Sequence, residues 1–129
     1  MSESYSDIVL DHAQNPRNRG LLEDANARGY QMNPVCGDTL VLMLRIEDDR
    51  IAEARFQTEG CTASLAASSI ITEMVTGLTL QEALDITHED VSAEVGGLPP
   101  SKLHSAALVI GGLQRAIAGY KQPQQGAPA

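Results

Sequence analysis

Two cysteines, Cys36 and Cys61, are the strongest nucleophiles and soft metal ligands that this 129-residue chain offers. Cys36 lies in residues 33–38, a segment whose proline and glycine predict a loop that leaves the thiol accessible. Cys61 directly precedes Thr62, the predicted cap of a helix, and a helix N-terminus favours a thiolate. A free cysteine is more often a small buried side chain, and for either cysteine alone we favour that interpretation. A shared location in the fold would favour metal binding or thiol chemistry instead.

The segment between the cysteines predicts a hairpin that brings them together. Residues 39–46 form a β-rich run, residues 51–58 alternate in polarity, and the aspartates at 48–49 predict the turn. Residues that face each other across such a hairpin have numbers that add up to about 97. The register is open by one residue, because a two-residue and a three-residue loop fit equally well. The two cysteines satisfy the relation. Both should therefore leave the open end of the hairpin, with Asp38 beside them.

His104 is a further candidate ligand. It lies in the first turn of a predicted C-terminal helix, after Pro99 and Pro100, where the helix dipole disfavours the charged imidazolium. The neutral imidazole is the form that binds metal, although spacing alone favours a surface or capping role. We assign His12, on an apolar helical stripe, and His88, in a polar turn, to structural roles.

The remaining pattern predicts one domain over residues 1–120 and a disordered tail over residues 121–129. Two adjacent glycines, Gly111 and Gly112, fall inside the C-terminal helix and predict a kink or a close packing contact there. Besides the hairpin, the expected elements are a helix from Tyr5 to the break at Asn15 and Pro16, an edge strand over 29–32, helices over 62–76 and 80–86, a short turn from Thr87, and a helix from Leu103 to Tyr120.

The composition excludes several classes of protein. Seventeen acidic residues against nine basic ones give a formal net charge of −8, which argues against a nucleic-acid partner because phosphate binding needs clustered lysine and arginine. A hydrophobic fraction of 43% argues against wholesale disorder. The sequence has no apolar run that could span a membrane, its first residues do not resemble a signal peptide, and two cysteines make no disulfide framework. We therefore expect a cytoplasmic protein with free thiols.

Four segments of the chain form a pattern of fixed order and spacing. They are Asp11-His12 with Asn15-Pro16-Arg17-Asn18-Arg19-Gly20, Asn33-Pro34-Val35-Cys36-Gly37-Asp38, Phe56 with Gly60-Cys61-Thr62-Ala63-Ser64, and Leu98-Pro99-Pro100-Ser101-Lys102-Leu103-His104. This pattern resembles the iron–sulfur cluster assembly scaffolds of the IscU and NifU N-terminal type, and the resemblance extends from Tyr5 to about Tyr120.

The resemblance implies an α+β fold, in which helices pack on a small three-stranded antiparallel sheet. Loops at one end of such a fold assemble a transient [2Fe-2S] cluster or hold iron, with zinc as the alternative. The resemblance also assigns ligand or cluster-modulating roles to four residues of this chain, Cys36, Asp38, Cys61 and His104. It implies a scaffold or carrier rather than an enzyme.

Three kinds of partner follow from the same resemblance. A cysteine desulfurase would deliver sulfur, and acceptor apoproteins would receive the cluster. An Hsp70-type chaperone would recognise the segment from Leu98 to Lys102, in which Ser101 stands where the family usually has an apolar residue. Neither nucleic acid nor a membrane is expected as a partner.

Ser105 departs from the family pattern, which has a third cysteine directly after the histidine. A serine hydroxyl stays protonated, binds iron–sulfur clusters and zinc poorly, and cannot carry a persulfide. Two thiols, one carboxylate and one imidazole still make a reasonable set of four ligands. Three functions are therefore weighed: a cluster scaffold, a zinc-bound sulfur relay for a desulfurase, and an adaptor that no longer turns over clusters. The short interval from Cys61 to His104 favours the scaffold branch.

Overall fold

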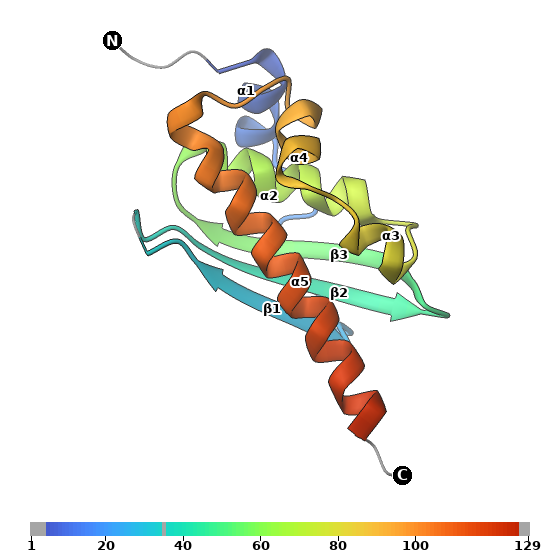
Figure 1. The fold of residues 1–129 in the computed structure, drawn as a ribbon. Helices are drawn as coiled ribbons and strands as arrows, with labels where there is room; N and C mark the ends of the chain where they lie inside the picture. Colours follow the sequence, from blue (N-terminus) through green and yellow to red (C-terminus); the bar gives the residue numbers. More distant parts are fainter. Residues whose placement is uncertain (1–4, 35, 127–129) are drawn as a thin grey trace.

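A three-stranded antiparallel sheet, in the order β1-β2-β3, lies under two long helices, α2 and α5 (Figure 1). The computed structural model describes residues 5–34 and 36–126, the last six by their backbone alone. Its architecture confirms the predicted α+β fold. In chain order the elements are α1 (Asp7–Gln14), β1 (Ala27–Met32), β2 (Thr39–Glu47), β3 (Arg50–Glu59), α2 (Thr62–Val75), α3 (Leu80–Leu84), α4 (His88–Glu94), the 3-10 turn η1 (Pro100–Lys102) and α5 (Leu103–Gly126).

The predicted hairpin is formed by β2 and β3, and its register changes along its length. Asp48 and Asp49 make a two-residue turn with φ of 53° and 65°, a left-handed conformation that aspartate tolerates. Next to the turn the strands pair as predicted. A bulge between Arg45 and Ile46 then shifts the partner by one residue, so the ladder ends at Thr39 opposite Glu59, the two residues of its last pair.

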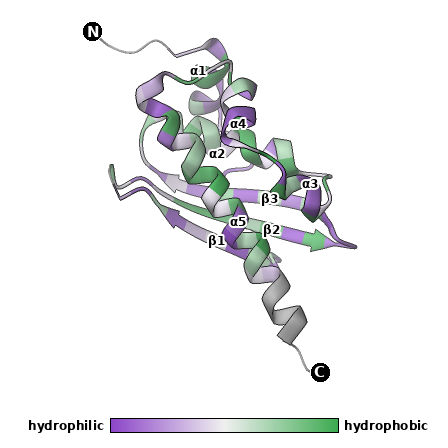
Figure 2. Cartoon of the chain, viewed as in Figure 1, coloured by the Kyte–Doolittle hydropathy of each residue, from purple (hydrophilic) through white to green (hydrophobic). Residues whose placement is uncertain are grey.

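The core lies between the sheet and the helices. One face of β2 is fully apolar, and α2 presents small residues on several sides because it packs against β3, α1 and α5 together. Figure 2 shows apolar residues along α2 and the central part of α5, the two helices that cover the sheet. The largest fully buried side chains include Phe56, the only phenylalanine, with Leu40, Leu42, Leu44, Ile71 and Leu113.

Glycines allow α5 to lie directly against the sheet. A Cβ atom on Gly29 of β1 would lie 2.1 Å from the carbonyl oxygen of Gly112, and a Cβ on Gly112 would lie 2.6 Å from Cδ2 of Leu40. The adjacent Gly111 faces Gln31 in the same way. The glycine pair of α5 therefore serves close packing, and the helix continues through it without interruption.

Two elements are longer than expected. Where a short turn was predicted after Thr87, α4 forms a seven-residue helix that opens with a capping box between Thr87 and Asp90. The backbone of α5 continues to Gly126, although the sequence predicts a disordered tail from Lys121. Adding residues to an existing helix costs far less than starting one, which accounts for the extension. Residues 127–129 of the predicted tail lie outside the described part.

None of the helices within residues 5–34 and 36–126 is both long enough and apolar enough to cross a membrane.

We predict that Gly29→Ala will lower the free energy of unfolding by about 2 kcal/mol or more, because the new methyl group forces α5 away from the sheet. Gly119→Ala is the matched control. Gly119 is exposed on the same helix, and its Cβ would approach no atom closer than 3.7 Å. This variant should gain up to about 1 kcal/mol from helix propensity. Urea denaturation measures both, and equal effects would contradict the packing argument.

Candidate metal centre

Three of the four predicted ligands converge at the open end of the hairpin. The thiol of Cys36, the carboxylate of Asp38 and the imidazole of His104 offer ligand atoms that all lie within 4.8 Å of one another. Cys36 is exposed in the loop before β2, Asp38 is buried just ahead of β2, and His104 is half-buried as the second residue of α5. Ligand atoms around one tetrahedral ion lie roughly 3–4 Å apart, so a small movement of the exposed loop would complete a site.

Cys61 lies beside this group rather than inside it. Its sulfur is 3.6 Å from Oγ of Ser64 and 3.9 Å from Oγ of Ser105, while its backbone N–H donates to Oδ2 of Asp38 at 3.4 Å. Cys61 itself is the N-cap of α2, so the predicted cap at Thr62 is wrong by one residue. Its role as a metal ligand stays a prediction.

The carboxylate of Asp38 is the most enclosed part of the centre. The residue is 7% exposed, and Oδ2 accepts a hydrogen bond of 2.5 Å from Oγ of Ser64 in addition to the Cys61 N–H. Burial alone raises the pKa of Asp38, but hydrogen bonds from Ser64, Cys61 and Cys36 outweigh it and lower the pKa below the ordinary 3.8. The carboxylate of Asp38 is therefore ionised at neutral pH, and it lies against the N-terminus of α2.

Gly60 makes room for this carboxylate. Asp38 comes just before Thr39 and Gly60 comes just after Glu59, the last pair of the ladder. The two residues therefore face each other across the open end of the hairpin. A Cβ on Gly60 would lie 2.5 Å from Cγ of Asp38 and 2.7 Å from its Oδ2. Any larger residue at position 60 would push the carboxylate out of its place.

Sequence reasoning missed Ser64, and it interpreted Ser105 only as a lost cysteine. Both are fully buried, and their hydroxyl oxygens lie 3.0 Å apart behind Asp38. The signal for Ser64 was available: it follows Cys61 by three residues at the start of α2, and residues three apart share a face of a helix. For Ser105, only the packing of α5 against α2 shows what its hydroxyl contacts.

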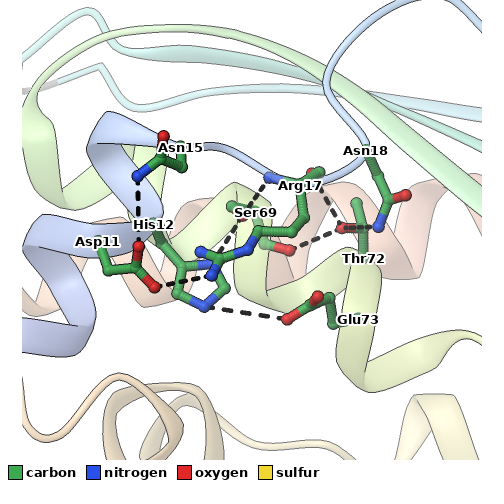
Figure 3. A network of polar contacts seen from close by, with 8 residues as sticks. All are labelled: Asp11, His12, Asn15, Arg17, Asn18, Ser69, Thr72 and Glu73. Atoms are coloured by element: carbon green, nitrogen blue, oxygen red, sulfur yellow. Dashed lines mark hydrogen bonds and ion pairs between the residues drawn. The ribbon is translucent and has the colours of Figure 1, made fainter.

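A second polar network joins α1 and the residues after it to α2 (Figure 3). The ring of His12 is 5% exposed, and its Nδ1 lies 2.7 Å from Oγ of Ser69, which also accepts the backbone N–H of Arg17. The other ring nitrogen lies 3.9 Å from the carboxylate of Glu73. Burial, followed by the charge of Arg17, lowers the pKa of His12, so the ring is neutral at pH 7.

The chain matches the NifU-like N terminal domain over residues 4–127. It belongs to this family. The iron-sulfur cluster assembly scaffold protein IscU 1 of Archaeoglobus fulgidus is 49% identical over 116 residues, which cover 90% of this chain and 76% of the relative. The iron-sulfur cluster assembly scaffold protein IscU of Aquifex aeolicus is 46% identical over 126 residues, and the match covers 96% of this chain and 80% of the relative. The crystal structure of a nitrogen-fixing NifU-like protein (N-terminal) from Brucella abortus shares the fold, with a TM-score of 0.73 at 20% identity over 91% of this chain and 94% of that one.

The matched range includes all four of the sequence segments that carry the predicted resemblance. Membership of the family also agrees with the predicted resemblance in both extent and fold.

We predict that acid will destabilise the protein through His12. Its pKa in the folded state lies below the ordinary 6.5 of the unfolded chain, so the unfolded state binds the proton first as pH falls. The free energy of unfolding should therefore be fully retained above about pH 6.5 and decline below it, until the folded-state pKa is passed. His12→Gln should flatten this part of the profile, whereas His88→Gln, at an exposed position, should leave it unchanged. Urea denaturation at a series of pH values gives the comparison.

Proposed function

We propose that this protein is an iron–sulfur cluster assembly scaffold. Iron or a [2Fe-2S] cluster is its cargo, held by Cys36, Asp38, Cys61 and His104 and passed on to acceptor proteins. The observation that carries the proposal is the convergence of Cys36, Asp38 and His104, a sulfur, oxygen and nitrogen donor set at one exposed end of the domain. The relatives from Archaeoglobus fulgidus and Aquifex aeolicus, which are named iron-sulfur cluster assembly scaffold proteins, support the same role.

The arrangement of the donors suits a carrier that must both accept and release its cargo. Asp38 is fixed by hydrogen bonds, whereas Cys36 is exposed on a loop and His104 is half-buried. A hard carboxylate in place of a thiolate weakens the hold on a cluster, which favours transfer. The protein would then act as a carrier without turnover of its own, in the cytoplasm, as one domain over residues 1–120. Zinc suits the same donors and is the alternative cargo.

Sulfur would come from a cysteine desulfurase as a persulfide, which a thiol reductant converts to sulfide. The segment from Leu98 to Lys102, which the chaperone would recognise, includes η1. Pro100 and Ser101 of η1 are exposed, whereas Leu98, which precedes η1, is only 8% exposed and belongs to the core. An Hsp70-type chaperone that bound the whole segment would have to draw Leu98 out of the core. This gives chaperone binding a means to loosen the start of α5, where His104 lies.

The proposal is tested by anaerobic reconstitution with Fe²⁺, cysteine, a cysteine desulfurase and a thiol reductant. We expect a [2Fe-2S] absorption spectrum and iron and sulfide in equal amounts. Transfer to an apo-ferredoxin should follow when the acceptor is added. A protein that instead holds stoichiometric zinc, carries a persulfide and forms no chromophore would favour the sulfur relay, and one with neither metal nor persulfide would exclude both.

We predict that Cys36→Ala and His104→Ala will each weaken Fe²⁺ or Co²⁺ binding by more than the roughly 10–100-fold that loss of an outer-shell partner costs. Each removes a donor atom from the converging group. The matched control for His104→Ala is His88→Ala, since His88 begins another helix, α4, and is exposed. Metal titration should show the wild-type affinity for this control. Unchanged binding by His104→Ala would remove the imidazole from the site.

A further inference from the structure

Two buried hydroxyl groups form a chain behind the carboxylate of Asp38. Oγ of Ser64, in the first turn of α2, lies 2.5 Å from Oδ2 of Asp38. Oγ of Ser105, on α5, lies 3.0 Å from Oγ of Ser64. Both serines are 0% exposed, so no solvent competes with these contacts. The chain therefore connects both helices that cover the sheet to a single carboxylate.

The chemistry of the groups fixes the direction of this chain. An ionised carboxylate can only accept hydrogen bonds, so Ser64 donates its proton to Asp38. With its proton used there, Ser64 accepts the proton of Ser105. Cys61 approaches the same pair, with its sulfur 3.6 Å from Ser64 and 3.9 Å from Ser105. The hydroxyl of Ser105 is thus turned towards Ser64.

We infer that Ser64 and Ser105 are positioning residues that hold the carboxylate of Asp38 in the orientation that receives a metal ion. This inference rests on the proposed function. The terminal torsion of an aspartate side chain is broad, so a free carboxylate rotates readily. Here the bonds from Ser64 and the Cys61 N–H both end at Oδ2. Neither bond occupies Oδ1, so this oxygen remains available to an ion that Cys36 and His104 would share.

The inference assigns Ser105 a role other than that of a ligand. The structure shows its oxygen engaged with Ser64, inside the core, where it supports the centre from behind. The effects of substitution should be graded along the chain. Ser64→Ala removes the bond to Asp38 itself, whereas Ser105→Ala removes only the support of Ser64 and should have the smaller effect in the same direction.

Ser68 provides a matched control on the same helix. It lies one turn after Ser64 and is 0% exposed, and its Oγ bonds to Oγ of Thr58 at 2.7 Å and to the carbonyl oxygen of Ser64 at 2.8 Å. Ser68→Ala therefore removes an equally buried hydroxyl from α2 without removing a bond to Asp38. Comparing Ser64→Ala with Ser68→Ala therefore separates the loss of a bond to the Asp38 carboxylate from a general loss of stability in α2.

The first experiment titrates the metal-free protein with Co²⁺ and records the visible spectrum, which reports the geometry of the ligands. Ser64→Ala should bind Co²⁺ about tenfold more weakly and change the spectrum, as loss of an outer-shell partner does. Ser68→Ala should match the wild type in both. The inference is overturned if Ser64→Ala and Ser68→Ala bind alike, whether both are weakened or neither is.

The second experiment needs no metal and distinguishes the inference from the proposed function. A double-mutant cycle combines Ser64→Ala with Asp38→Ala and measures unfolding by urea. We expect a coupling of about tenfold or more in the unfolding equilibrium constant, as for a hydrogen bond to a charged group. Additive effects would show that Ser64 does not hold Asp38. If the wild type binds no Co²⁺ while the coupling is present, the proposed function fails and the positioning of Asp38 stands.

Discussion

The end of the domain that carries the candidate centre depends on keeping a buried negative charge hydrogen-bonded. Asp38 is 7% exposed, and an ionised carboxylate removed from water is costly unless donors replace the solvent. The donors come from α2, as the N–H of Cys61 and the hydroxyl of Ser64, and Gly60 leaves the space that the carboxylate fills. The start of β2, the end of β3 and the first turn of α2 are thereby fixed to one group.

This constraint divides the centre into a rigid part and an accessible part. Asp38 is fixed from the side of the core, and Ser105 connects that fixed part to α5. Cys36, two residues earlier on an exposed loop, and His104, half-buried at the start of α5, are free of that packing. In the proposed scaffold, a rigid anchor would lower the entropy lost when a metal ion binds, and accessible donors would allow the ion to leave by exchange with another protein.

Local signals in the sequence were enough to place Cys36, Asp38 and Cys61 near one another, but not to show how Asp38 is held. The aspartate turn and the two predicted strands beside it brought Cys36 and Cys61 to one end of the hairpin, because turn position sets the register. The bulge at Arg45, which shifts that register and sets Asp38 opposite Gly60, has no comparable local signal. The pairing of Ser64 with Ser105 arises from the packing of α2 against α5, a contact between residues far apart in the chain.

Ser105 changes the sulfur chemistry more than it changes the metal site. The converging donors are Cys36, Asp38 and His104, and none of them is lost when residue 105 is serine. A hydroxyl cannot form a persulfide, so any persulfide on this chain would form at one of the two cysteines. Cys61 borders a cavity of about 310 Å³ between α1 and the start of α2, whereas Cys36 lies on the exposed loop beside the other two converging donors. Sulfur arriving at Cys61 would leave Cys36, which belongs to the converging group, to hold iron.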